Sequence, residues 1–228
     1  SEAEQRIASV VFVNEGVMQS TGNMMIIGDQ LDQVGVVKGG DVEVTVGNVR
    51  NVGNVVSDDV LRIEVHQLVQ AGGLHGKAIE IDGVHVENTG DVVSDEGLEM
   101  TVDQLVQVGR LVGQDIRIEG GDVENTGSIG GKQVEIEAET LQQGETGIVQ
   151  AETIRFGVGE LGQDGVVSGT DVVVEGGLIV NNGVMVGNQL QITGREVENG
   201  GVLKGKEQLV LDLTSLVHCG QIETGSDL

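Results

Sequence analysis

The stretch VENTGDVV at residues 86–93, which returns as VENTGSIG at residues 123–130, carries the pattern that decides the fold. Each copy places a side-chain amide two residues after an apolar residue, a glycine two residues after the amide, and another apolar residue two further on. The same glycine recurs twelve times at intervals of 18 to 20 residues, and the residue two positions after it is apolar every time. A repeat of this length that runs from one end of the sequence to the other predicts a solenoid.

Each repeat also contains two apolar residues separated by one position, as at Met24 and Ile26, before a third such as Leu31. Spacing by two is typical of strands, and the spacing of three and four that marks helical repeats is missing. The chain has no Pro, Trp or Tyr and only two Phe, which fits central strands around a narrow aliphatic core. We therefore predict an all-β fold, a right-handed parallel β-helix of about twelve coils of 18–20 residues with three short strands per coil.

The repeat runs without a break, so we predict a single β-helix domain over residues 1–228. Residues 1–11 form a possible N-terminal cap or partial coil, and residues 216–228 form an incomplete last coil. One irregularity is the pair Gly144 and Glu145, inserted between the amide and the glycine of one repeat. Because solenoids accept insertions at turns, a bulge at that corner is expected.

A side-chain amide precedes the glycine in eleven of the twelve repeats, by two positions in ten of them and by four at Gln143, where the insertion lies. Stacked corners place these side chains above one another, so they are predicted to hydrogen-bond from coil to coil. Asn and Gln alternate through the first eight repeats, which resembles a two-coil unit of about 37 residues. The glycine is expected to supply a positive φ at the corner. The predicted amide ladder comprises Asn14, Gln33, Asn51, Gln70, Asn88, Gln107, Asn125, Gln143, Gln163, Asn181 and Asn199, and His218 takes the twelfth place.

Two features of the outer surface follow from the same phasing. Opposite charges alternate at the outward position of the first strand in the middle repeats, as at Arg62 and Glu80, and predict ion pairs between coils. In the last repeats aliphatic residues take this outward position, and in three consecutive repeats they also take the position right after the corner glycine. They indicate a possible apolar contact stripe, although β-branched residues also simply favour strands. The residues of this stripe are Val166, Val184, Val202, Val173 and Val210.

Composition argues against several kinds of partner. With a net charge of −25 and a pI near 4.2, the chain repels nucleic acid, and no run of 18 apolar residues indicates membrane insertion. His66, His75 and His85 occupy different phases of the repeat, and neither a phosphate-binding loop nor a nucleophile–base pair is present. We expect no catalytic residues, no metal ligands and no cofactor.

The stretches at residues 86–93 and 123–130 resemble the L-x-N-x-G-x-I repeats of filamentous haemagglutinins, the exoproteins of bacterial two-partner secretion that include stalks of contact-dependent inhibition toxins. The resemblance covers nearly the whole chain. It implies a right-handed β-helix exported to the surface of a Gram-negative cell, as a rod for adhesion or toxin delivery. The departures are Gln in half of the amide column and an unusually high content of Glu and Val.

The leading functional hypothesis is a non-enzymatic structural rod or stalk of a secreted or surface-displayed adhesin. Its partner would be a receptor on a host or neighbouring cell. A self-assembling β-helical filament, joined through exposed coil ends, is the alternative, and a designed solenoid would have the same pattern. A polysaccharide-active β-helix enzyme is disfavoured, since sugar-binding enzymes usually carry aromatic platforms and this chain has no Trp or Tyr.

Overall fold

The computed structural model describes residues 4–225 and forms two compact units, Ser1–Asp115 (unit 1) and Ile116–Leu228 (unit 2). Both units are all-β, and no helix occurs within the described range. Nothing in this arrangement tests whether residues 1–228 are a single domain, so that interpretation stays a prediction. The strands that begin in unit 1 are β1 (Gln5–Asn14), β2 (Val17–Gln19), β3 (Met24–Gln33), β4 (Val36–Gly39), β5 (Val42–Asn51), β6 (Asn54–Ser57), β7 (Val60–Gln70), β8 (Gly73–Asn88), β9 (Asp91–Gln107), β10 (Arg110–Val112) and β11 (Asp115–Asn125). Those that follow in unit 2 are β12 (Ser128–Gly130), β13 (Gln133–Gln143), β14 (Ile148–Gln163), β15 (Val166–Asn181), β16 (Val184–Asn199), β17 (Val202–His218) and β18 (Gln221–Thr224).

Unit 1 stacks coil on coil by parallel pairing. The long strands pair in the series β1, β3, β5, β7, β8 and β9, and the short strands β2, β4 and β6 form a second series that joins β8. The register advances by one repeat at each step, so that Leu31 lies beside Val49 and Gln33 beside Asn51. The predicted parallel β-helix is therefore confirmed.

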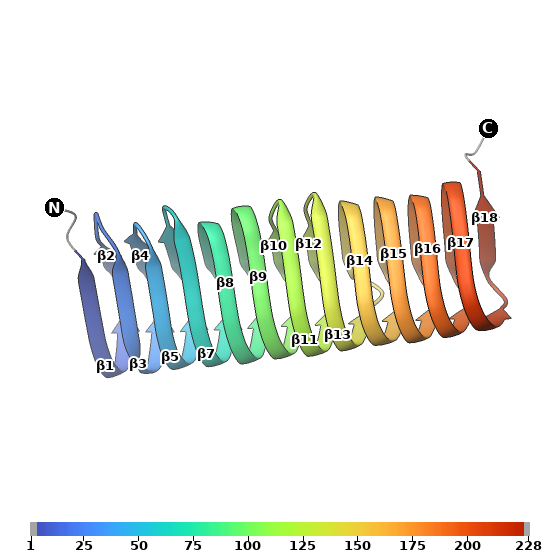
Figure 1. The fold of residues 1–228 in the computed structure, drawn as a ribbon. Helices are drawn as coiled ribbons and strands as arrows, with labels where there is room; N and C mark the ends of the chain where they lie inside the picture. The colour runs from blue at the N-terminus through green and yellow to red at the C-terminus, as the bar shows by residue number, and fades with distance from the viewer. Residues whose placement is uncertain (1–3, 226–228) are drawn as a thin grey trace. The chain divides into compact units, whose positions relative to one another are not determined.

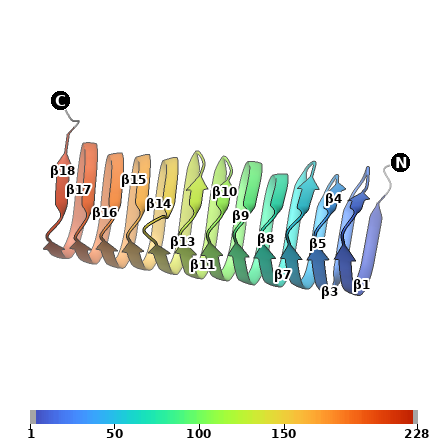
Figure 2. The ribbon, with the colours of Figure 1, turned by 180° about the vertical axis from the view of Figure 1, so that it is seen from behind.

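Unit 2 is stacked in the same way. β13 and β12 both pair with β14, and the series continues through β15, β16 and β17 to β18. Strands β14 to β17 run through two corners as single elements of 16 or 17 residues. In each unit the coils descend on the near side and return on the far side as the chain advances, which is right-handed winding (Figure 1). The return strands are seen from behind in Figure 2.

Three straight faces make up a coil, and each contributes inward side chains. In the coil that contains β3, the first face buries Met24 and Ile26, the second buries Leu31 and Gln33, and the third buries Val37. Alternation along each strand sends the residues between them outward. The same columns are filled by Val, Ile, Leu and Met in the following coils, and Phe156 is 1% exposed in a column otherwise held by aliphatic residues. Burial of this continuous aliphatic stack is the main stabilising term of the fold.

The predicted bulge is found at the corner between β13 and β14. Gly147 N–H donates to Gly144 O at 2.8 Å and closes a tight turn, while Thr146 Oγ1 donates to Thr126 O of the coil before it at 2.8 Å. The inserted residues therefore leave the coil without disturbing the columns on either side, since Val149 still pairs in register with Ile129.

Candidate functional site: the amide corner

All eleven amides of the predicted ladder lie inside the coils. None is more than 6% exposed, although their polar groups would be costly to bury without partners. They occupy the corner between the second and third faces, where the strands break and backbone groups lack ladder partners. At most of these positions the backbone carbonyl of the amide residue accepts from two N–H groups of the next coil, as Asn14 O does from Val34 and Gly35, both at 2.9 Å.

In unit 1 the side-chain bonds join the amides in pairs. The Nδ2 of each Asn donates to the Oε1 of the following Gln, at 2.8 Å from Asn14 to Gln33, 2.6 Å from Asn51 to Gln70 and 2.8 Å from Asn88 to Gln107. Each bond links adjacent coils, and each pair is one copy of the 37-residue unit that the alternation of Asn and Gln predicts.

Side-chain amide nitrogens also donate hydrogen bonds to the backbone of the next coil. The acceptor is the carbonyl of the residue just after the next corner glycine, as from Gln33 Nε2 to Asn54 O at 3.3 Å and from Gln70 Nε2 to Asp91 O at 3.4 Å. Some Asn oxygens accept from their own corner, as Asn88 Oδ1 does from Gly90 N–H at 3.2 Å. The amides thus serve the backbone as well as one another.

Unit 2 begins with the same arrangement and then changes it. Asn125 donates to Gln143 at 2.8 Å, but further along Asn181 donates directly to Asn199 at 2.7 Å. Asn199 Nδ2 lies 3.1 Å from His218 Nδ1, so the histidine continues the column as a hydrogen-bond partner.

The corner glycines do not have the positive φ that was expected. Of the described residues only Gly225, outside the column, has a positive φ, so that prediction is wrong. Glycine is required for a different reason. A Cβ atom at Gly53 would overlap the carbonyl oxygen of Gly35 one coil earlier, and one at Gly183 would overlap that of Gly165. The corners stack too closely for any side chain to fit between them.

The structure shows a second polar column, which was not predicted from the sequence. Ser57 and Ser94 are buried at the corner between the third face and the next first face. Ser94 Oγ lies 2.8 Å from Lys77 O of the previous coil and 2.7 Å from Gly97 O of its own turn, and Ser57 makes the equivalent contacts. The two serines are 37 residues apart, as is Ser20 from Ser57, and this period was the signal that could have revealed them.

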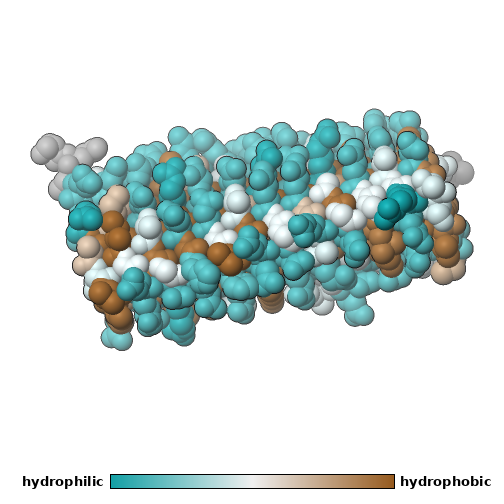
Figure 3. Space-filling view, turned by 60° about the horizontal axis from the view of Figure 1, so that its bottom comes forward, coloured by the Kyte–Doolittle hydropathy of each residue, from teal (hydrophilic) through white to brown (hydrophobic). Residues whose placement is uncertain are grey.

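The outer charges form pairs in part as predicted. Arg62 Nη2 lies 2.6 Å from Glu80 Oε2 across adjacent coils, and this hydrogen-bonded carboxylate raises the pKa of Arg62. Arg117 instead pairs with Glu119 of its own strand, at 2.6 Å, with Glu137 further away at 3.9 Å. The bond to Glu119 raises the pKa of Arg117. Figure 3 shows that hydrophilic residues cover most of the side in view of both units.

The five residues of the predicted apolar stripe fall into two columns. Val166, Val184 and Val202 are register partners on the third face, and Ile148, which sequence reasoning missed, extends their column by one coil. Val173 and Val210 lie on the first face with Gln191 between them, so they are not part of the same surface. We use the name third-face stripe for Ile148, Val166, Val184 and Val202. Whether it makes a contact stays a prediction.

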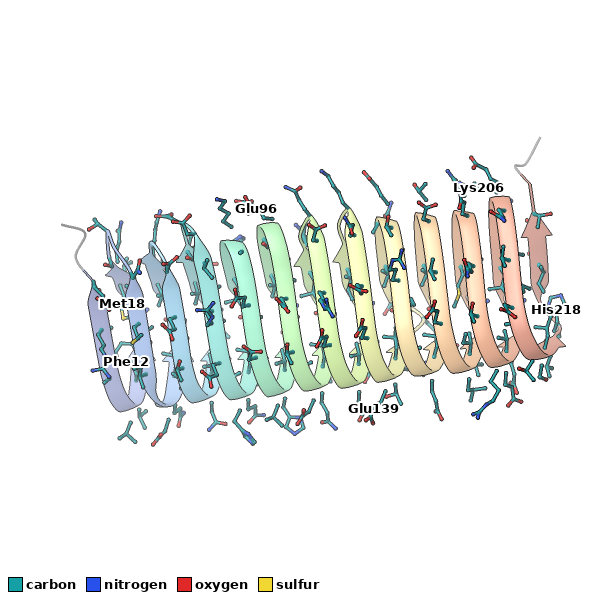
Figure 4. The ribbon with its side chains drawn as sticks, viewed as in Figure 1. Phe12, Met18, Glu96, Glu139, Lys206 and His218 are labelled. Atoms are coloured by element: carbon teal, nitrogen blue, oxygen red, sulfur yellow. The ribbon has the colours of Figure 1, made fainter. Side chains whose placement is uncertain are left out.

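Exposed valines also gather around the amide corner of unit 1, at Val34, Val52 and Val108. Of the charged side chains, Glu96 and Lys206 project outward before the first face of their coils, and Glu139 projects after it (Figure 4). Between residues 4 and 225 no group of three or more His, Cys, Asp or Glu is arranged to hold a metal ion. The same part of the chain contains no helix able to span a membrane.

No protein-family model, no curated protein and no solved structure matches the chain. The geometry of the coils therefore carries the functional argument.

Proposed function

We propose that the chain is a non-enzymatic structural rod, a stalk of a secreted or surface-displayed bacterial adhesin related to the haemagglutinin-type repeats. The observation that carries the proposal is the repetition itself. In both units, coil after coil fills the same inward positions with aliphatic residues and the same corner with an amide and a glycine. Such a sequence is selected for stacking, and stacked repeats give a spacer whose length is set by the number of coils.

The resemblance supports this proposal through the chemistry of its motif. In the stretch at residues 123–130, Val123 fills the core, Asn125 Oδ1 accepts from Gly127 N–H at 3.2 Å, and Ile129 fills the core again. The apolar residues, the amide and the glycine of the motif are thus the residues that hold one coil on the next. The strongly acidic exterior, at a net charge of −25, keeps a long repetitive surface soluble.

Two variants of the protein produced in its native cell test this proposal. An epitope tag placed between Gly144 and Glu145 sits in the corner loop outside the columns. We expect the tag to be accessible to antibody on intact cells. Deletion of residues 51–87 removes one two-coil unit and rejoins Arg50 to Asn88 in phase, so we expect a folded stalk shorter by about 10 Å, with the tag still accessible.

A deletion of residues 51–78 is the matched control, because it joins coils out of phase and should unfold the region. Detection of the tag only after cell lysis would contradict surface display. Loss of adhesion after the in-phase deletion, with the tag still displayed and the fold intact, would indicate a local binding site in residues 51–87 instead of a spacer.

A further inference from the structure

The step from β13 to β14 in unit 2 lacks polar contacts that join other coils at the amide corner. Gln143 and Gln163 are register partners across this step, and both are 0% exposed. Among the described residues, Gln143 Nε2 has no acceptor and Gln163 Oε1 has no donor. One coil earlier, by contrast, Asn125 Nδ2 donates to Gln143 Oε1 at 2.8 Å. A buried donor and a buried acceptor that stay unpaired at the same step weaken it.

The backbone at this corner is also joined less completely. Gln143 O accepts one backbone bond from the next coil, from Asp164 N–H at 2.8 Å. Gln163 O accepts two such bonds from the coil that follows it, at 2.7 and 2.8 Å. The insertion is the physical reason, because it places the carbonyl of Gly144 over Gly165 in addition to that of Gly147.

The outer surface does little to hold this step. Glu135 and Arg155 are register partners of opposite charge, but no ion pair joins them within the described part of the chain. Gly157 of β14 offers no side chain to the outward residue beside it in β13, so a cross-strand pair is missing. The bond from Gln142 Nε2 to Asp164 Oδ2 does cross the step, but it is long, at 3.3 Å, and exposed to solvent.

The core columns nevertheless continue through the step. Leu161 lies beside Leu141 and Phe156 beside Ile136, and none of the four is more than 1% exposed. The step is therefore closed, and apolar burial and strand pairing hold it. Because the stability of a solenoid is approximately a sum over coils and over contacts between neighbouring coils, the step with the fewest polar contacts opens most readily.

We propose that the step from β13 to β14 is a built-in opening point, at which unit 2 parts into two cooperative blocks, residues 116–143 and 148–225, before its other coils separate. In a stalk under tension this step would open first; that mechanical role rests on the proposed function, whereas the opening itself does not. The coil from Gly147 to Gly165 contains 18 residues. Such a coil occupies about 4.8 Å of the axis when stacked and about 60 Å when drawn out, so opening lets a rod lengthen without global unfolding.

Hydrogen exchange of the 228-residue chain, followed by NMR, compares equivalent amides at two steps. Asp164 N–H and Val166 N–H donate across the proposed opening point at 2.8 and 2.9 Å. Asn182 N–H and Val184 N–H make the equivalent bonds one coil later, at 2.7 and 2.9 Å. Because the bond lengths match, a difference in protection factor reports the opening of the step. We expect the first two amides to be less protected by about tenfold or more.

A deletion restores the regular corner. Removal of Gly144 and Glu145 leaves Gln, Thr and Gly in succession, with the spacing of Asn125, Thr126 and Gly127. We expect this variant to raise the protection of the two amides at the step to that of their equivalents one coil later. Glu145→Ser is the matched control, because it keeps the insertion, and it should exchange like the parent. Circular dichroism checks that the deletion variant folds, and the comparison within the parent chain does not depend on it.

The role under tension is tested by pulling between two points of unit 2. Glu139 and Lys206 project outward from coils on either side of the step (Figure 4). Cysteines at these two positions, with Cys219→Ser to remove the native thiol, accept the handles. We expect the deletion of Gly144 and Glu145 to raise the force of the first rupture, and Glu145→Ser to leave it unchanged.

Equal protection at the two pairs of amides, or lower protection one coil later than at the proposed step, would overturn the inference. A folded deletion variant that exchanges like the parent would also overturn it. Low protection at the step, combined with a rupture force that the deletion does not change, would contradict the role under tension. None of these results bears on surface display, which the epitope tag tests separately.

Discussion

The amide corner of unit 1 and that of unit 2 beyond Gln163 use the same residue types in two arrangements. In unit 1 the links between side chains come in separated pairs, as from Asn51 to Gln70, and the next Gln-to-Asn step relies on the backbone. In the later coils of unit 2 the links are consecutive, from Asn181 to Asn199 and from Asn199 to His218. The structural repeat is therefore a pair of coils in one region and a single coil in the other.

Coil length changes together with the amides. In unit 1 the Asn-to-Gln coils contain 19 residues and the Gln-to-Asn coils 18, and Ser57 and Ser94 stand in the longer ones, where they bond to the extra turn. From Gly147 to Gly201 every coil has 18 residues, and small residues such as Gly169 and Gly187 replace the serine. Within each region, the side-chain length at the amide corner and the number of residues at the serine corner therefore change together.

Some buried polar atoms of the amide column lack partners, and most of them lie where the alternation of Asn and Gln fails. Among the described residues, four buried side-chain atoms of this column have none: Asn51 Oδ1, Gln143 Nε2, Gln163 Oε1 and Asn181 Oδ1. Three of them lie in unit 2, where Gln163 follows Gln143 in register and the alternation fails. The amide column therefore contributes most to stability where Asn and Gln alternate.

The largest expected loss of stability comes from substitution of a corner glycine, and this loss should be the same in the two regions. Gly53→Ala and Gly183→Ala each place a Cβ atom on the carbonyl of the preceding corner, so each should cost about 3 kcal/mol of unfolding free energy in urea titrations. Gly16→Ala is the control, since its site is open, and it should leave stability unchanged or slightly raised. If Gly53→Ala unfolds like the parent chain, close stacking is not what selects glycine at these corners.

Substitution of an amide should cost different amounts of stability in the two regions. Gln70→Leu removes the acceptor of Asn51 Nδ2 and strands that buried donor, so it should cost about 1–3 kcal/mol. Gln163→Leu removes an oxygen that already has no partner and a long bond of 3.5 Å to Val184 O, so its cost should be clearly smaller. Equal losses in the two variants would show that the side-chain pair of Asn51 and Gln70 adds no stability beyond that of the unpaired amide at Gln163.

The columns can be predicted from the sequence because the same type of residue returns at each inward position in every coil, and only one environment favours that type. Leu31, Asn51 and Gly53 can be assigned to core and corner from spacing alone, and the structure places them there. The reason for the glycine could not be obtained in this way, because a short side chain suits both a positive φ and a close backbone approach. Only the position of the Gly35 carbonyl over Gly53 distinguishes the two.

Surface contacts were harder to predict, because the repeat determines the face on which a residue lies but not the neighbour that its side chain contacts. Arg62 and Arg117 have the same phase, yet one pairs with Glu80 in the next coil and the other with Glu119 in its own strand. Whether the outward valines form a contact surface also stays a prediction. Val173 and Val166 are both outward valines, but they belong to different faces of the coil.

The smallest expected effect concerns these two arginines. Both arginines have a raised pKa. Any stability that they contribute is therefore fully present below the usual arginine pKa and is lost only as the pH rises through the raised value. Near neutral pH both side chains stay charged. Arg62→Gln removes a bond between coils and should cost well under about 1 kcal/mol, because the pair is exposed to solvent and screened by salt. Arg117→Gln breaks a bond within one strand and should change the unfolding midpoint less. Urea titrations of both variants at low and high salt measure the difference, and a larger loss at Arg117 would mean that its distant contact with Glu137 holds the coils together instead.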